Sequence, residues 1–213
     1  MSEVVLHDYW RSSASYRVRI ALNVVGLEYD SVPVDILKGE QRQSDYLGLN
    51  PQGLLPTLEL DGHRMTQSLA IIEYLAELHP EARMLPADPL GRHRVRALSY
   101  AIAMDIHPIC NSHVAAHVVE LTGREEARPE WMRRFIGQGL KAFEALLDHP
   151  ATGTFCHGDL PGMADFCLVP QVYNAERWGA DLSGCARLLE ITERCRVLPA
   201  FAAAHPHAVR PAD

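Results

Sequence analysis

The sequence lacks any long hydrophobic run. No stretch approaches the roughly 20 consecutive apolar residues that a membrane helix needs, although apolar residues make up 47% of the 213 residues. The amino-terminal residues lack the basic segment and the apolar core of a secretion signal. Lys and Arg are outnumbered, 20 against 27 Asp and Glu, and the net charge of −7 argues against a nucleic-acid surface. We therefore expect a globular protein that binds neither membranes nor nucleic acids.

Cysteines are few, odd in number and widely spaced. The five cysteines include no CxxC pair, which argues against a disulfide framework and against a zinc site. The 11 histidines are scattered as well, without an HExxH motif. We therefore expect no bound metal, a reducing cytoplasmic location, and cysteines that mostly serve as small core residues.

The first part of the chain alternates between strand and helix patterns. Periodicity and turn signals, above all the hairpin dipeptide Asp61-Gly62, predict a β-α-β unit followed by a β-β-α unit. The predicted elements are a strand over 4–10, a helix ending near Gly26, strands over 29–34, 57–60 and 63–65, and a helix over 69–79. The strand-helix-strand order usually pairs the first two strands in parallel.

The rest of the chain is helical in pattern. The proline-rich stretch 80–92 has no strand pattern and is interpreted as a linker between two domains. The predicted helices that follow cover about 90–121, 129–148, 163–178 and 183–196, and residues 205–213 are expected to be frayed.

Serines stand at the turn from the first strand into the first helix. The stretch 9–16 places Ser12 and Ser13 there, next to Arg11. A helix N-terminus offers free N–H groups and a partial positive charge, and a serine hydroxyl can donate to a bound anion. If that anion is a thiolate, its pKa falls and more of it is reactive at neutral pH. On this motif alone, an ordinary N-cap serine is the favoured explanation.

Two further features suggest a ligand with a carboxylate and a peptide-like backbone. Pro56 precedes a strand, where a cis Leu55–Pro56 bond would leave the Leu55 backbone free to pair with an extended ligand, although a simple loop proline is an alternative. Gln67 and Ser68 begin the next helix, whose N-terminus suits a carboxylate or is simply capped by the serine.

Five segments of the chain resemble the zeta class of the glutathione transferase superfamily, which includes the maleylacetoacetate and maleylpyruvate isomerases. The segments are RSSASYRVRIAL, NPQGLLPTL, QSLAIIEYL, LLPADP and MADFCLVPQV, and they follow the family's order and spacing over nearly the whole chain. The resemblance implies a thioredoxin-like α/β domain over 1–83, an all-α domain over 90–213, a homodimer, and glutathione as cofactor.

The resemblance also implies roles for individual residues. Ser12, with Ser13 beside it, would hold the glutathione sulfur. Leu55 and Pro56 would pair with the cysteinyl backbone, Gln67 and Ser68 would bind the γ-glutamyl carboxylate, and Gln52 with Lys38 or Gln41 would lie near the glycyl end. Asp105 would reach toward the partner subunit's glutathione, with His107 and Asn111 on the same segment. Arg11 and Arg177 would bind the carboxylates of a dicarboxylate substrate, although Arg177 is equally well explained as a solvated residue at a helix end.

The sequence departs from the zeta pattern at several positions. Ala14 replaces the usual signature cysteine, so any role of that thiol is lost. Gly162 replaces the usual Ser or Thr cap of a helix in which Asp165 would complete a structural box. Ser112 and His113 stand where maleylpyruvate-type relatives carry arginines. This last departure favours maleylacetoacetate as the substrate.

The implied activity is the glutathione-dependent cis-trans isomerisation of maleylacetoacetate to fumarylacetoacetate, in the breakdown of aromatic amino acids through homogentisate. One alternative is the maleylpyruvate isomerase of the gentisate pathway, which performs the same chemistry on a shorter substrate. Another is a zeta-class glutathione transferase acting on α-halo acids. A third is a non-catalytic protein that binds glutathione.

Overall fold

The computed structural model describes residues 4–211 and divides into two compact units. The first unit contains the residues up to Met84 together with those from Val197 onward, and the second is Leu85–Arg196. Residues 197–213 are predicted to belong to the helical domain, whereas the contacts group 197–211, the described part of this segment, with the first unit. The physical reason is that its helix α9 (Pro199–Ala204) packs on α1 (Ser13–Val24).

The sheet of the first unit has four strands in the order β2-β1-β3-β4. The strands are β1 (Val4–Asp8), β2 (Asp30–Pro33), β3 (Thr57–Leu60) and β4 (His63–Thr66). The predicted parallel pairing of β1 with β2 is confirmed, and β3 is antiparallel to both β1 and β4. The predicted hairpin turn is confirmed as well, since Asp61 and Gly62 have φ of 52° and 76°, as a turn of this kind requires.

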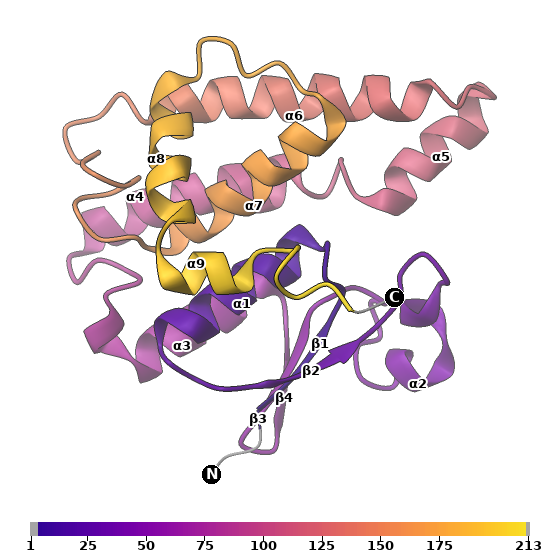
Figure 1. The fold of residues 1–213 in the computed structure, drawn as a ribbon, viewed down its shortest axis with the longest axis horizontal. Helices are drawn as coiled ribbons and strands as arrows, with labels where there is room; N and C mark the ends of the chain where they lie inside the picture. Colours follow the sequence, from indigo (N-terminus) through magenta and orange to yellow (C-terminus); the bar gives the residue numbers. More distant parts are fainter. Residues whose placement is uncertain (1–3, 212–213) are drawn as a thin grey trace. The chain divides into compact units, whose positions relative to one another are not determined.

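The helices α1 and α3 (Ser68–Leu78) lie side by side over the sheet, and α2 (Ser44–Leu47) lies apart from them (Figure 1). Short 3-10 turns flank these helices at Glu40–Arg42 and Pro80–Ala82. Apolar side chains such as Leu6, Ile20 and Ile71 are fully buried between sheet and helices. Because α9 covers another side of α1, residues 13–22 of α1 are all buried, including two arginines.

A buried arginine joins three segments of the first unit. Arg19 is 1% exposed and its Nη1 donates to both carboxylate oxygens of Asp8, at 2.9 and 2.6 Å. Its Nη2 donates to the Trp10 carbonyl and its Nε donates to the Ala204 carbonyl, both at 3.0 Å. A buried charge needs such full pairing to be tolerated. Arg19 therefore fixes the end of β1, the turn that follows it and the C-terminal segment relative to one another.

The second unit is helical (Figure 1). Its elements are α4 (Pro89–Tyr100), the π-helix η3 (Ala101–Ile106), α5 (Ser112–Thr122), α6 (Ala127–Leu146), α7 (Met163–Trp178) and α8 (Ala186–Arg196). The prediction of one helix over 90–121 is wrong, because the chain widens into a π-helix and then breaks. Pro108 contributes to the break, since it has no N–H to continue the helical hydrogen bonds.

The helix α7 is buried along most of its length, and an aspartate fixes its first turn. Asp165 is 1% exposed, and its carboxylate accepts from the backbone N–H groups of Gly162 and Cys156, each at 2.9 Å. Burial raises the pKa of this carboxyl, while the two N–H donors lower it. These contacts support the predicted structural role of Asp165 and compensate for the missing side-chain cap at Gly162.

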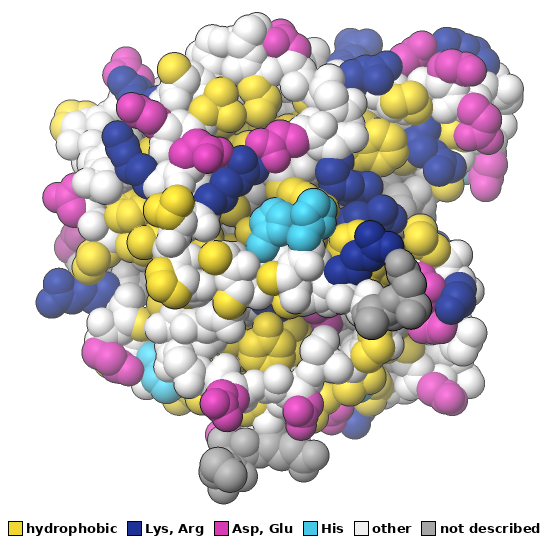
Figure 2. Space-filling view, viewed as in Figure 1, with side chains coloured by type: hydrophobic (Ala, Val, Ile, Leu, Met, Phe, Trp, Pro, Cys, Tyr) yellow, Lys and Arg dark blue, Asp and Glu magenta, His cyan; other side chains and the backbone are white. Residues whose placement is uncertain are grey.

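No helix within residues 4–211 is long and apolar enough to cross a membrane. Acidic and basic side chains are intermixed over most of the face shown in Figure 2. All five cysteines are free and buried, as expected of core residues. Among the described residues, no group of three or more His, Cys, Asp or Glu is arranged to hold a metal ion.

Candidate functional site

The turn between β1 and α1 presents a serine hydroxyl at a helix N-terminus. The turn is closed by a hydrogen bond from Ser12 N–H to the Tyr9 carbonyl, 2.8 Å long. Ser12 is the N-cap of α1, and its Oγ accepts from the backbone N–H of Ser15 at 3.2 Å. Because Oγ is an acceptor in the cap, the hydroxyl hydrogen remains available to be donated to a ligand. Capping and anion binding are therefore compatible at Ser12.

Aromatic rings and a guanidinium surround this turn. Arg11 donates to the Tyr9 hydroxyl at 3.2 Å, and its guanidinium carbon lies 5.1 Å from the centroid of the Trp10 ring. Ser13, next in the chain, is buried at 9% exposure, and Ser12 is half-buried. The turn thus combines a cation, the positive end of α1 and a hydroxyl donor, which together favour a bound anion.

The loop before β3 has the predicted cis peptide bond between Leu55 and Pro56. A buried hydroxyl fixes both sides of this bond, because Tyr46 Oη donates to the Leu54 carbonyl at 2.7 Å and lies 2.9 Å from Thr57 Oγ1. Asn50 Nδ2 donates to the same Leu54 carbonyl at 2.8 Å. The backbone of Leu55 is therefore held in a defined position at the edge of the sheet region.

A buried cation supports the N-terminus of α3. Ser68 is 7% exposed, and its Oγ accepts from Arg17 Nη1 at 3.3 Å. Arg17 is itself 2% exposed. The guanidinium adds to the partial positive charge of the helix N-terminus, and the first turn of α3 contains no acidic residue to offset it. This end of α3 is therefore suited to a carboxylate.

Gln67 adopts an uncommon backbone conformation directly before α3. Its φ of 69° and ψ of 105° are unusual for a residue with a side chain. Such conformations are concentrated at ligand sites, where the surrounding structure maintains them. The Gln67 amide Nε2 donates to Gln52 Oε1 at 2.9 Å, so the structure brings these two predicted residues together.

Three predicted residues lie around the break between η3 and α5 in the second unit. Asp105 is exposed within the π-helix, a conformation that is frequent at functional sites. His107 N–H donates to the Ile102 carbonyl, which closes the wide turn, and Asn111 is the N-cap of α5. Asn111 Oδ1 also lies 3.0 Å from His113 Nδ1.

Arg177 lies in the last turn of α7 and is exposed. Its Nη1 donates to Asn174 Oδ1 at 3.4 Å, and its guanidinium lies about 6 Å from two aromatic rings, 6.0 Å from Tyr173 and 5.9 Å from Trp178. These contacts orient the side chain.

The chain's own thiols are poor candidates for the reacting group. Ala14 is buried in α1 and supplies only a methyl group at the position where the family signature carries cysteine. Burial raises the pKa of Cys110 to about 11, and burial also raises the pKa of Cys156 and Cys195. A thiol with a raised pKa carries little thiolate at neutral pH. A reactive thiolate at Ser12 would have to come from a ligand.

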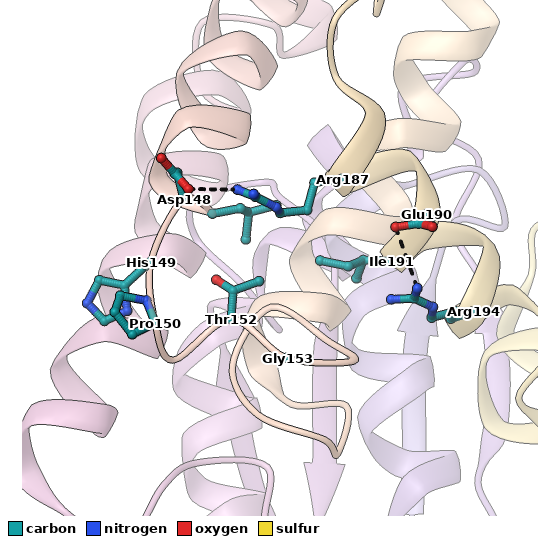
Figure 3. Close-up of a pocket in the computed structure, with 10 residues that line it drawn as sticks. Asp148, His149, Pro150, Thr152, Gly153, Arg187, Glu190, Ile191 and Arg194 are labelled. Atoms are coloured by element: carbon teal, nitrogen blue, oxygen red, sulfur yellow. Dashed lines mark hydrogen bonds and ion pairs between the residues drawn. The ribbon is translucent and has the colours of Figure 1, made fainter.

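The second unit contains a polar pocket of about 520 Å³, which is lined by the segment that follows α6 and by residues of α8. Figure 3 shows Arg187 pointing toward Asp148 and Arg194 toward Glu190, each pair 3.5 Å apart. The pocket therefore carries balanced charges. None of the residues predicted from sequence lines it.

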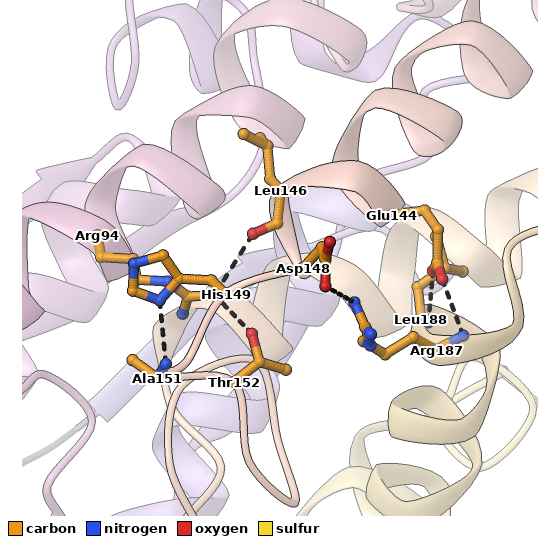
Figure 4. Close-up of polar contacts among 9 residues, drawn as sticks. All are labelled: Arg94, Glu144, Leu146, Asp148, His149, Ala151, Thr152, Arg187 and Leu188. Atoms are coloured by element: carbon orange, nitrogen blue, oxygen red, sulfur yellow. Dashed lines mark hydrogen bonds and ion pairs between the residues drawn. The ribbon is translucent and has the colours of Figure 1, made fainter.

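The polar side chains around this pocket form hydrogen bonds that stabilise the local fold (Figure 4). Glu144 accepts from the N–H groups of Arg187 and Leu188 and so caps the start of α8. Arg94 donates to Thr152 Oγ1 at 2.7 Å and to the Leu146 carbonyl at 3.5 Å, which fixes the loop after α6. These contacts shape the fold, so the first unit remains the stronger candidate for chemistry.

Sequence reasoning missed the supporting residues Arg17, Tyr46 and Asn50. The signal for Arg17 is its place in a helix that is otherwise apolar on the same face, where an arginine requires buried partners. Tyr46 and Asn50 give no comparable signal, because their role depends on a loop geometry that only the fold reveals. The site as a whole can hold a thiolate, an extended backbone and a carboxylate.

The chain is similar to several known proteins. A family model described as the glutathione S-transferase N-terminal domain matches residues 2–77. A protein of Rhizobium meliloti (strain 1021) named maleylacetoacetate isomerase is 62% identical over 211 residues, with 99% of each chain covered. The holo structure of a bacterial zeta-class maleylpyruvate isomerase is 39% identical, with a TM-score of 0.95 and 98% and 100% of the two chains covered.

A third similar protein has been solved with ligands in its active site. The maleylacetoacetate isomerase of Anaeromyxobacter dehalogenans 2CP-1 with bound glutathione is 41% identical, with a TM-score of 0.90 and 100% and 99% of the two chains covered. Another structure of that protein holds dicarboxyethyl glutathione and citrate.

Proposed function

Since the chain belongs to the glutathione transferase superfamily, and within it to the zeta-class maleylacetoacetate isomerases, we propose that it converts maleylacetoacetate to fumarylacetoacetate with glutathione as cofactor. The observation that carries this proposal is the Ser12 hydroxyl, which caps α1 through its oxygen and keeps its hydrogen for a thiolate. The 62% identity to a maleylacetoacetate isomerase over the full length supports the choice of substrate.

The residues of the first unit fit glutathione at three points. The Ser12 hydroxyl and the N-terminus of α1 suit the sulfur, and the fixed backbone of Leu55 suits the cysteinyl peptide group. Ser68, supported by buried Arg17, suits the γ-glutamyl carboxylate, and the Gln67–Gln52 pair provides further amide groups. The three points match a thiol, a peptide group and a carboxylate.

Bound glutathione would supply a thiolate that adds to one carbon of the cis double bond, which becomes a single bond free to rotate, and that leaves again as the trans double bond forms. Ser12 donates its hydroxyl hydrogen to the sulfur and so lowers the pKa of the thiol. Ser68 and Gln67 orient the cofactor, so that its sulfur stays at the N-terminus of α1. Arg11 offers a guanidinium to negative charge that develops on the substrate or to one of its carboxylates. Arg177 is proposed as a second carboxylate-binding residue.

The proposal extends to assembly and location. We propose a homodimer in which Asp105 contacts the glutathione of the partner subunit, with His107 and Asn111 on the same segment. The exposed position of Asp105 in η3 supports this assignment. We also propose a cytoplasmic location, which the five free cysteines support because thiols persist in reducing compartments.

Maleylpyruvate isomerisation is the second candidate, favoured by the TM-score of 0.95 to a maleylpyruvate isomerase. Ser112 and His113 argue for the longer substrate, because they are not the arginines expected for maleylpyruvate. The test is the glutathione-dependent loss of absorbance of each substrate with the purified protein. We expect faster turnover of maleylacetoacetate, expressed as kcat/KM. Turnover of neither substrate by a protein that binds glutathione would refute the isomerase function.

A further inference from the structure

Two guanidinium groups flank the tryptophan of the turn before Ser12. The guanidinium carbon of Arg11 lies 5.1 Å from the centroid of the Trp10 ring, and that of Arg210 lies 5.4 Å from the same centroid. Both contacts have the geometry of cation–π interactions. Arg210 comes from the C-terminal segment, 200 residues after Trp10 in the sequence, and its side chain is exposed.

The position of Arg210 is built into the first unit. Arg19 binds the Ala204 carbonyl and the Trp10 carbonyl through the same guanidinium. Asn23 Nδ2 donates to the Ala200 carbonyl at 3.0 Å, which adds a second attachment of α9 to α1. The ring of His205 then stacks edge-on against Tyr16 of α1, with centroids 6.0 Å apart. These contacts direct the segment after α9 back to the turn that holds Ser12.

We propose that Arg210 is a positioning residue for the substrate, which acts together with Arg11 as a pair of guanidinium groups that binds an anionic electrophile next to the thiolate. This inference rests on the proposed function. The chemistry it assigns to the ligand is a dicarboxylate, since each planar guanidinium can bind one carboxylate through two N–H donors.

The Trp10 ring gives the pair its specificity. Cation–π contact with a single rigid ring limits the conformations of both long side chains, so less entropy is lost when each guanidinium binds a carboxylate. A ligand with two carboxylates next to the sulfur gains from both cations, whereas the γ-glutamyl carboxylate of glutathione is proposed to bind at the separate site of Ser68. Removal of Arg210 is therefore expected to weaken dicarboxylate binding selectively.

The test compares two ligands by titration calorimetry, glutathione and dicarboxyethyl glutathione, which adds two carboxylates at the sulfur. The variants are Arg210→Gln and Arg210→Lys, with Arg64→Gln as a charge-matched control. Arg64 forms an ion pair with Glu59, its cross-strand partner. Glu59 is also paired with Val5, near the start of β1, whereas the turn that holds Ser12 follows the end of β1. We expect Arg210→Gln to lower the affinity for dicarboxyethyl glutathione about fivefold or more. The affinity for glutathione should change by less than about twofold.

The controls separate positioning from a merely structural role. Arg210→Lys keeps the charge but not the two-donor guanidinium, so it should recover only part of the preference for dicarboxyethyl glutathione. Arg64→Gln should leave that preference unchanged. Equal losses of affinity for both ligands in Arg210→Gln would mean that the residue only fastens the C-terminal segment, and would overturn the inference. An unchanged preference would overturn it too. Because the readout is binding, a wild type that binds dicarboxyethyl glutathione selectively but isomerises nothing would refute the proposed function alone.

Discussion

Replacement of Ser12 is expected to separate two roles that one hydroxyl performs. Its oxygen accepts from Ser15 N–H and caps α1, while its hydrogen is available to the glutathione sulfur. Ser12→Ala removes both interactions. Ser12→Gly removes the hydroxyl as well, but glycine is a tolerated N-cap.

The magnitudes follow from these contacts. Loss of the cap in Ser12→Ala is expected to cost about 1 kcal/mol of the free energy of unfolding, against a few tenths in Ser12→Gly. For a chain of this size, 1 kcal/mol corresponds to a fall in Tm of about 2–4 °C. Loss of a donor that stabilises the reacting anion is expected to lower kcat/KM about 100-fold in both variants, since one such donor contributes about 10²–10³ in rate.

The assays are thermal unfolding and glutathione-dependent isomerisation of maleylacetoacetate, supported by a pH titration of bound glutathione by ultraviolet absorbance. The pKa of the bound thiol should be higher in both variants than in the wild type, because the donor to the thiolate is gone. Ser13→Ala is the matched control. A large loss of activity in Ser13→Ala with full activity in Ser12→Ala would refute the reasoning, because it would assign the sulfur to the neighbouring serine.

Two other predictions concern buried groups. Asp165→Ala leaves the N–H groups of Gly162 and Cys156 without an acceptor, and we expect it to lower the free energy of unfolding by about 2–4 kcal/mol in denaturant titration. Burial raises the pKa of Asp165 in the folded state, so the contribution of this residue to the free energy of unfolding is lost as pH rises through the folded-state pKa. The destabilisation caused by Asp165→Ala should therefore be larger at pH 4 than at pH 8. A larger destabilisation at pH 8 would contradict this prediction. Burial raises the pKa of Cys110 to about 11, so an NMR titration of isotope-labelled Cys110 in the folded protein should show a thiol that is still mostly protonated at about pH 10. Ionisation near about pH 9 would indicate an ordinary thiol.

Local patterns in the sequence were sufficient for the sheet and for most helices. Asp61-Gly62 specifies its turn by backbone preference alone, and α7 begins and ends where its apolar periodicity predicts. The helix predicted over 90–121 failed because periodicity cannot distinguish a continuous helix from one that widens into η3 and breaks at Pro108. Fraying was predicted over 205–213, of which 212–213 lie outside the described residues. Up to residue 211 the prediction missed the contacts of His205 with Tyr16 and of Arg210 with Trp10, which depend on tertiary packing.

The candidate site was predictable where a residue type has a specific chemical reason to be present. The serines at the start of α1 and α3 belong to this group, and so does the proline before β3. The residues that hold these groups in place were not predictable. Arg17 and Tyr46 act through partners that are 51 and 11 residues away in sequence, and such pairings arise only when the sheet and helices have assembled.

The hydrogen bonds of Arg19 also have a consequence for synthesis of the protein. Its four acceptors include the carbonyl of Ala204, so the cation at the centre of the first unit is fully paired only when the chain has been made beyond α9. During translation, strands β1 to β4 emerge long before that segment, and one face of α1 stays uncovered while the second unit is made. The unit proposed to bind glutathione is therefore the first to begin folding on the ribosome and the last to be completed.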